Sequence, residues 1–406
     1  MQTALSEELR ATSMGRDADD ILRTCVHCGF CNATCPTYQL LGDELDGPRG
    51  RIYLMKQMLE GRPVTARTRT HLDRCLTCRA CETTCPSGVR YGDLVDIGRH
   101  LIERRAPRPP AQRLLRRAMR ALFSHAGRFR ALIRSGQILR PLLPGSLRGL
   151  VPPRAAAGPW PVARHSRRMV VLDGCVQPTL APDINAAAAR VLDRLGVSLQ
   201  TAPRAGCCGA LSLHLGAEGE ARDFARRNID AWWPELESGA EAIVMTASGC
   251  GVFVRDYERL LAEDPDYCGK AARISELTRD LSEVLSADAL TPPGDGELGA
   301  VAFHSPCTLQ HGQRITGRVE ALLEACGYRL VPVPEGHLCC GSAGTYSLLQ
   351  RDLSGQLLER KLRALESEAP DVIATANIGC LSHLAGGARV PVAHWVQLVD
   401  EALAGR

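Results

Sequence analysis

Eight cysteines in the N-terminal part of the chain fall into two runs with the same spacing. The runs read Cys25-x2-Cys28-x2-Cys31-x3-Cys35-Pro36 and Cys75-x2-Cys78-x2-Cys81-x3-Cys85-Pro86. Three thiolates spaced in this way can bind three irons of one cubane, while the fourth, turned away by the proline that follows it, reaches a second cubane. We therefore predict two [4Fe-4S] clusters. The predicted ligands are Cys25, Cys28, Cys31 and Cys85 for the first cluster, and Cys35, Cys75, Cys78 and Cys81 for the second.

A pair of structural zinc sites is the alternative explanation of these runs, because zinc takes four thiolates from CxxC pairs. Zinc requires only two short pairs, however, and leaves two full runs that both end in Cys-Pro unexplained. Two cubanes that share their loops would also lie close together, which is the arrangement that electron transfer requires. The spacing therefore favours iron–sulfur chemistry over zinc.

A second set of cysteines is repeated further along the chain. Adjacent cysteines rarely chelate one ion because their side chains diverge, but a multi-iron cluster or redox thiol chemistry can use both. We interpret each copy as a further cluster site or a group of redox thiols, with buried structural thiols as the alternative. The copies are Cys175, Cys207, Cys208 and Cys250, and then Cys307, Cys339, Cys340 and Cys380, with a glycine after each pair. Cys268 and Cys326 fall outside the pattern and are expected to be packing residues.

The elements that must position these later cysteines alternate between apolar runs and helical patterns. Four apolar runs are typical of buried strands in a parallel sheet, and each delivers a cysteine just after its C-terminal end: MVVLDGC, EAIVMTASGC, VAFHSPC and DVIATANIGC. INAAAARVLDRLG and GRVEALLEACG are typical of crossover helices that end at a glycine. Ligands bind outside the carboxyl ends of parallel strands, so these cysteines should gather on one rim. The repeat predicts two duplicated α/β modules with parallel sheets.

The 406-residue chain is long enough for two or three domains. We predict a mostly helical ferredoxin-like domain with two [4Fe-4S] clusters at 1–103 and a connector at 104–168. Two α/β modules follow, each named a CCG module after its Cys-Cys-Gly sequence, at 169–290 and 298–406. The connector is rich in Arg and Pro and poor in acidic residues. Within it, the segment from Arg113 to Arg134 predicts a basic amphipathic helix. We favour packing of its apolar face on this protein over contact with an anionic membrane or a partner.

The composition of the whole chain excludes several classes of function. A formal net charge of +4 is small for this length and gives no case for nucleic-acid binding. No stretch approaches the roughly 20 apolar residues of a membrane-spanning helix, and the polar start MQTALSEELR lacks the apolar region of a signal peptide. We therefore expect a cytoplasmic protein and leave peripheral contact with the inner face of the cell membrane open. In a reducing compartment its 18 cysteines are expected to be free thiols or metal ligands.

Two further patterns are weaker indications of function than the cysteine runs. The segment from Gly294 to Gly299 fits GxGxxG, but it follows two prolines and runs into a strand, the reverse of a dinucleotide-binding context. We predict a linker there, and no flavin or NAD in this chain. His27, His304 and His311 lie near predicted cluster cysteines, where a histidine can hydrogen-bond a sulfur and tune its potential. A surface or packing role is equally open for these histidines.

The order of these motifs resembles the iron–sulfur subunit of bacterial glycolate oxidase (glycolate dehydrogenase) over nearly the whole chain. The first part, including GPRGRIYLMK between the cysteine runs, is shared with relatives such as the small subunit of anaerobic glycerol-3-phosphate dehydrogenase. The segments GCVQPTLAPDINAAAARVLDRLGV and CCGALSLHLG favour the glycolate family. One departure is clear: CCG domains of the heterodisulfide-reductase type end in CxxC, whereas Ala247 and Asn377 stand where the additional cysteine would fall.

The resemblance implies an oxidoreductase complex in which FAD-binding subunits oxidise glycolate to glyoxylate. This chain would pass the electrons through the eight N-terminal ligands named above to an acceptor such as membrane quinone, without a substrate site of its own. The alternatives are an electron-transfer subunit of a related flavin dehydrogenase for glycerol 3-phosphate or lactate, a heterodisulfide-reductase-like catalytic subunit, and a redox-insensitive scaffold. The eight-cysteine pattern disfavours the scaffold, and the missing fifth thiols disfavour the catalytic subunit.

Overall fold

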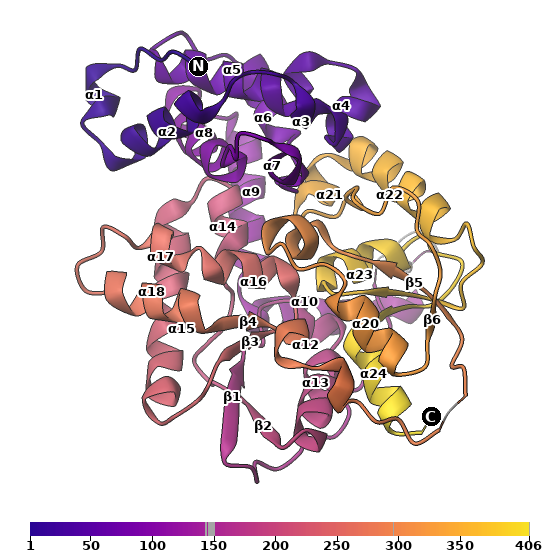
Figure 1. Ribbon diagram of the computed structural model, residues 1–406. Coiled ribbons are helices and arrows are strands. Elements are labelled where there is room, and N and C mark those ends of the chain that lie inside the picture. The colour runs from indigo at the N-terminus through magenta and orange to yellow at the C-terminus, as the bar shows by residue number, and fades with distance from the viewer. Residues whose placement is uncertain (143, 145–150, 295, 406) are drawn as a thin grey trace.

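The computed structural model describes residues 1–142, 144, 151–294 and 296–405. Figure 1 shows a helical N-terminal domain, in indigo and purple, above two α/β modules. Two predicted segments lie partly outside the described residues: the connector at 143 and 145–150, and the GxGxxG segment at 295. The α/β multidomain fold predicted from the sequence is confirmed.

Short helices form the N-terminal domain because cysteine loops and prolines interrupt the chain. Pro36 and Pro48 stand in the first turns of their helices, where the missing N–H has no hydrogen bond to lose. The longer helices bury apolar faces, and Met55, Leu59 and Leu94 are fully buried. The elements are α1 (Glu7–Arg10), α2 (Ser13–Thr24), α3 (Phe30–Ala33), α4 (Pro36–Leu41), η1 (Glu44–Asp46), α5 (Pro48–Leu59), α6 (Ala66–Asp73), α7 (Ala80–Thr84) and α8 (Tyr91–Arg105).

The connector contains two helices, α9 (Pro110–Phe123) and α10 (Ala126–Leu139), and then a short turn of 3-10 helix, η2 (Arg140–Leu142). The prediction of one helix from Arg113 to Arg134 is therefore wrong. The chain turns at Ser124, which brings the Phe123 and Phe129 rings to 5.6 Å between centroids. Phe129 is buried, but Leu114 is 68% exposed, so the apolar face packs on this protein only in part. Among the described residues, no helix is long and apolar enough to cross a membrane.

Each module is built on a parallel sheet. In the described part of the chain the first sheet has the order β2-β1-β3-β4, with β1 (Arg167–Val171), β2 (Val197–Thr201), β3 (Ile243–Met245) and β4 (Thr278–Asp280). The second has the order β6-β5-β7-β8, with β5 (Ala300–His304), β6 (Arg329–Leu330), β7 (Val372–Thr375) and β8 (Val392–His394). Every pairing is parallel. The four predicted strands are β1, β3, β5 and β7, and a cysteine follows each of them.

Helices connect the strands of both modules. α13 (Asp183–Arg194) and α20 (Arg318–Ala325) occupy the two predicted crossover segments. Gly196 (φ 76°) and Gly327 (φ 93°) follow them in the left-handed conformation, which glycine adopts without the steric cost that a side chain would add. The first module also contains α12 (Gln177–Leu180), α14 (Ala210–His214), α15 (Glu218–Glu237), α16 (Ser248–Arg255), α17 (Tyr257–Leu260), α18 (Cys268–Leu277), α19 (Leu281–Val284) and η3 (Ala287–Ala289). The second contains the π-helical turn η4 (Thr308–Gly312), α21 (Tyr346–Leu349), α22 (Arg351–Leu365), α23 (Ile378–Ala385) and α24 (Trp395–Leu403).

The two modules pack against each other over one apolar core. α13 of the first contacts α24 of the second, and Arg190 pairs with Asp400 at 2.7 Å beside this core. His394, which is fully buried, donates from Nε2 to the carbonyl oxygen of Thr246 at 2.8 Å and accepts from the Val396 N–H through Nδ1. The N-terminal domain contacts both modules, through α8 on α14 and through α4 on α22. The cysteine-bearing ends of the modules therefore meet the domain that carries the two cysteine runs.

Candidate iron–sulfur sites

The first group of predicted ligands lies around one pocket. Cys25, Cys28, Cys31 and Cys85 all line it, beside the start of α5. Burial, and then the neighbouring Cys25, raise the pKa of the Cys31 thiol to about 11. The structure thus places three cysteines of the first run next to the last cysteine of the second run.

The second group of predicted ligands combines Cys35, the last cysteine of the first run, with Cys75, Cys78 and Cys81 of the second run. Burial raises the pKa of the Cys81 thiol well above its usual value, and the neighbouring Cys78, Cys75 and Cys35 raise it further. Tyr91 donates its hydroxyl to Cys75 Sγ at 3.6 Å. Such a donor stabilises the thiolate, which is the form that binds metal.

The loops that carry both groups have left-handed backbone at the same two positions of each run. His27 (φ 60°) and Gly29 (φ 91°) flank Cys28, and Thr77 (φ 55°) and Arg79 (φ 59°) flank Cys78. Left-handed backbone is rare for a branched residue such as Thr77, and such strain persists only where the surrounding structure or a bound group demands it. It turns the loop around the thiols.

These features fit the binding of two [4Fe-4S] clusters. Each group offers four thiols, the number that one cubane takes. All 18 cysteines are free thiols, so no disulfide competes for the sulfurs.

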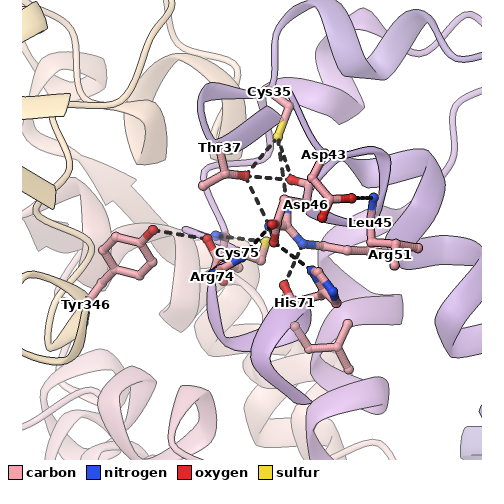
Figure 2. Close-up of polar contacts among 12 residues, drawn as sticks. Cys35, Thr37, Asp43, Leu45, Asp46, Arg51, His71, Arg74, Cys75 and Tyr346 are labelled. Carbon is pink, nitrogen blue, oxygen red and sulfur yellow. Dashed lines mark hydrogen bonds and ion pairs between the residues drawn. The ribbon is translucent and has the colours of Figure 1, made fainter. Parts of the chain in front are cut away.

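A buried charged network holds the loop of Cys35 in place (Figure 2). Asp46 is fully buried, and its carboxylate oxygens lie 2.7 Å from Arg74 Nη1, 3.0 Å from His71 Nδ1 and 3.5 Å from Arg51 Nη2. Arg51 is 1% exposed and reaches Cys35 Sγ at 3.9 Å through Nη1. A fixed positive charge therefore lies beside a predicted ligand of the second cluster.

The first CCG module brings its four predicted cysteines together at the ends of β1 and β3. Cys207 lies beside Cys175 and Cys208, and its interaction with these two thiols lowers the pKa of the Cys207 thiol well below its usual value. Cys208 in turn contacts Cys250. Thiols gathered in this way, with Cys207 and Cys208 buried, can share one metal centre or exchange protons and electrons.

The second CCG module repeats this arrangement and adds a histidine. The Sγ atoms of Cys307 and Cys339 lie 3.8 Å apart, and Cys340 contacts both Cys339 and Cys380. His304, the last residue of β5, lies next to Cys340 and Cys380 and is 1% exposed. Burial, and then the nearby Lys361 ammonium, lower the pKa of His304 well below its usual value. Both effects favour the neutral imidazole.

The second N-terminal group adjoins the thiols of the second module. Cys78 and Cys307 pack against one apolar cluster that contains Leu76, Cys339 and Tyr346. The negative charge of Cys307 also raises the pKa of Cys78, after burial. The Tyr346 hydroxyl donates to the carbonyl oxygen of Arg74 at 3.1 Å across this junction (Figure 2). Thiols of two domains, Cys78 on one side and Cys307 and Cys339 on the other, thus meet at one apolar cluster.

The structure adds residues that the sequence did not single out and corrects one prediction. Asp46 and Arg51 lie in or beside GPRGRIYLMK, but a charged residue in a sequence gives no sign that it is buried. Cys326 packs in the core as predicted, whereas the packing role predicted for Cys268 is wrong, because it begins α18 with its side chain exposed. Asn377 caps α23 by accepting from the Gly379 N–H at 3.2 Å.

Comparison with known proteins agrees with this arrangement. Residues 21–89 match the 4Fe-4S dicluster domain, and residues 169–255 and 301–385 match the cysteine-rich CCG domain. The glycolate oxidase iron-sulfur subunit of Escherichia coli (strain K12) is 56% identical, over 99% of each chain. This chain belongs to the glycolate oxidase iron-sulfur subunit family. The resemblance inferred from the motifs is therefore confirmed, and the chain is an electron-transfer subunit that contains a 4Fe-4S dicluster domain.

More distant relatives extend the comparison. The probable glycolate oxidase iron-sulfur subunit of Bacillus subtilis (strain 168) is 31% identical, over 89% of this chain and 87% of the relative. The crystal structure of a hypothetical protein from Helicobacter pylori superposes with a TM-score of 0.55 at 12% identity, over 98% of this chain and 74% of that one. The latter similarity concerns the fold alone.

Proposed function

We propose that this chain is the electron-relay subunit of a glycolate-oxidising oxidoreductase complex. It receives electrons from FAD-binding partner subunits that convert glycolate to glyoxylate, and it passes them to a quinone-type or other acceptor. The observation that carries the relay is the apolar cluster on which Cys78 of the N-terminal domain meets Cys307 and Cys339 of the second module. The name of the E. coli relative supports glycolate as the donor.

The ligand assignment is part of this proposal. Cys25, Cys28, Cys31 and Cys85 hold the first [4Fe-4S] cluster, and Cys35, Cys75, Cys78 and Cys81 hold the second. The paired-cysteine groups of the two modules hold further clusters or act as redox thiols. When bound, such clusters supply one-electron transfer. The residues of this chain orient the sulfurs and, through Arg51, place a positive charge beside Cys35.

Relay without substrate oxidation follows from the chemistry of the donor. Oxidation of a 2-hydroxy acid removes two electrons and requires a two-electron cofactor beside the substrate. We therefore assign that step to a flavin partner. The CCG modules are poorly suited to heterodisulfide-type catalysis, because Ala247 carries no donor atom and the Asn377 amide oxygen is already used as a helix cap.

The test is reconstitution with the flavin partners. The isolated chain should not oxidise glycolate, and its addition should restore glycolate-dependent reduction of a dye or quinone. Glycolate, D-lactate and glycerol 3-phosphate are compared as donors, since the related flavin dehydrogenases are the alternative. A clear preference for glycerol 3-phosphate would overturn the assignment of the donor.

Peripheral contact with the inner face of the membrane would bring the chain to a quinone. The connector helices expose apolar residues among arginines: Leu114, Leu115, Leu132, Ile138, Leu139 and Leu142. Such a surface suits an anionic interface. Sedimentation with vesicles of anionic lipid should be lost when Leu114 and Ile138 are both changed to Ser. Equal sedimentation of both proteins would exclude this surface.

A further inference from the structure

His304 is a buried polar side chain without a hydrogen-bond partner. It ends β5 with 1% exposure, and neither ring nitrogen is hydrogen-bonded to any residue that the structure describes. Buried polar atoms are almost always paired, because an unpaired one keeps the full cost of leaving water. A function other than packing must therefore account for a histidine at this buried position.

Two thiols face this imidazole. A ring nitrogen of His304 and the sulfurs of Cys340 and Cys380 all lie within 4.8 Å of one another, and all three side chains are buried. They come from three elements: the end of β5, the CCG loop and the first turn of α23. Nitrogen and thiolate sulfur are donors that iron and zinc both accept.

The first module has no such histidine, although its thiols are arranged in the same way. Three residues before Cys307 stands His304, and three residues before Cys175 stands Leu172, which is buried and apolar. Packing alone is thus satisfied by leucine at this place in the fold. The chain itself supplies a matched apolar replacement for the histidine.

The histidine also replaces a missing donor. Asn377 stands where a CxxC motif would place a fifth cysteine, but its Oδ1 accepts from the Gly379 N–H and its Nδ2 donates to Thr308 Oγ1 at 3.4 Å. Lys361, 2% exposed, donates to the carbonyl oxygen of Glu335 at 2.9 Å and places a positive charge near these thiols. This charge offsets part of the negative charge that thiolates would bring.

We propose that His304 is a metal ligand of the second CCG module, binding through a ring nitrogen the same ion as Cys340 and Cys380. The ion is thiophilic and of the first transition row, either iron of a cluster or zinc. Each thiol that coordinates releases one proton to solvent, and the neutral imidazole donates a lone pair without releasing any. The first module, with Leu172, binds through thiols alone. This inference rests on the proposed metal-binding role of the module and is independent of the electron donor and acceptor.

Spectroscopy of the wild-type full chain tests the proposal without a variant. The chain is purified anaerobically with natural or 15N-labelled histidine, and its iron and zinc are quantified. If the ion is iron, pulsed EPR should show a nitrogen coupling that changes from 14N to 15N with the label. If it is zinc, X-ray absorption at the zinc edge should show one imidazole nitrogen. Absence of a histidine nitrogen from every metal in the protein would overturn the proposal.

Variants then assign the nitrogen to one residue. His304→Leu should abolish the histidine coupling and weaken metal binding in the second module at least about tenfold, with the N-terminal EPR signals unchanged. His304→Cys should restore the metal without the nitrogen. His311→Leu is the control, because both nitrogens of His311 already have partners, Thr83 Oγ1 and the His337 carbonyl oxygen, at 2.9 Å each.

The outcomes distinguish a failure of the His304 proposal from a failure of the proposed relay function. If Cys340→Ser loses the metal of the module and His304→Leu keeps it, the ion is held by thiols alone and the histidine proposal is wrong. The relay function then still stands. If instead the histidine coupling is present but glycolate reduces no cluster in the reconstituted complex, the relay function fails and His304 remains a ligand.

Discussion

The substitution Asp46→Asn tests whether the buried charged network holds the second cluster site. It removes the carboxylate that faces Arg51 at 3.5 Å while keeping the shape of the side chain. At an effective dielectric constant of about 20, the lost attraction is about 5 kcal/mol. Removing one partner of a buried ion pair typically costs about 3–5 kcal/mol. The pair with Arg74, whose side chain is 32% exposed, is screened and adds little.

The expected result is a large loss of thermal stability in the N-terminal domain. For a domain of this size, 3 kcal/mol corresponds to a fall in melting temperature of at least about 12 °C. Because Arg51 contacts Cys35, the second cluster should be lost first on warming. The signal of two interacting clusters would then become that of one isolated cluster.

The assay follows cluster absorbance and EPR during anaerobic heating of the full chain. Asp43→Asn is the matched control: Asp43 caps η1 by accepting from the Leu45 N–H at 2.9 Å, and asparagine caps equally well. It should leave the melting temperature nearly unchanged. If Asp46→Asn melts within a few degrees of Asp43→Asn and retains both clusters, the charged network does not hold the second cluster site.

Cys28→Ser and Cys78→Ser should each lose one cluster, about four irons, and weaken folding of the N-terminal domain; stoichiometric zinc without iron in the wild type would contradict this. Cys208→Ala and Cys340→Ala should lower iron content or electron transfer with the N-terminal EPR signals intact, and full iron and activity in both would make these thiols structural. Burial lowers the pKa of His394 from 6.5 to about 4, so the unfolded chain binds the proton more readily. Stability should therefore fall as pH decreases from 6.5 towards 4, by about 2 kcal/mol at pH 5; His394→Asn should remove this part of the pH dependence of the melting temperature, and an unchanged profile would exclude His394 as its source.

The sequence predicts the groups of thiols better than it predicts what surrounds them. Cysteine spacing and the Cys-Pro steps limit which thiols can meet, and apolar runs before Cys175 and Cys307 suffice to predict parallel strands. The burial of Asp46 and the absence of a hydrogen-bond partner for the His304 ring nitrogens both depend on contacts between distant segments. The spacing of residues in the sequence does not encode such contacts. The sequence also does not predict the break between α9 and α10, because Ser124 continues the helical pattern locally and the contact of Phe123 with Phe129 is tertiary.

The most direct test of the relay is the reduction of the clusters by substrate. The complex is reconstituted anaerobically from this chain and its flavin partners, mixed with glycolate and frozen at intervals for EPR. We expect signals of reduced, interacting [4Fe-4S] clusters to appear with glycolate only when the flavin partners are present, and to be absent from the isolated chain. Glycolate oxidation by the isolated chain, or flavin reduction in the complex without any reduction of the clusters, would contradict the proposed electron relay.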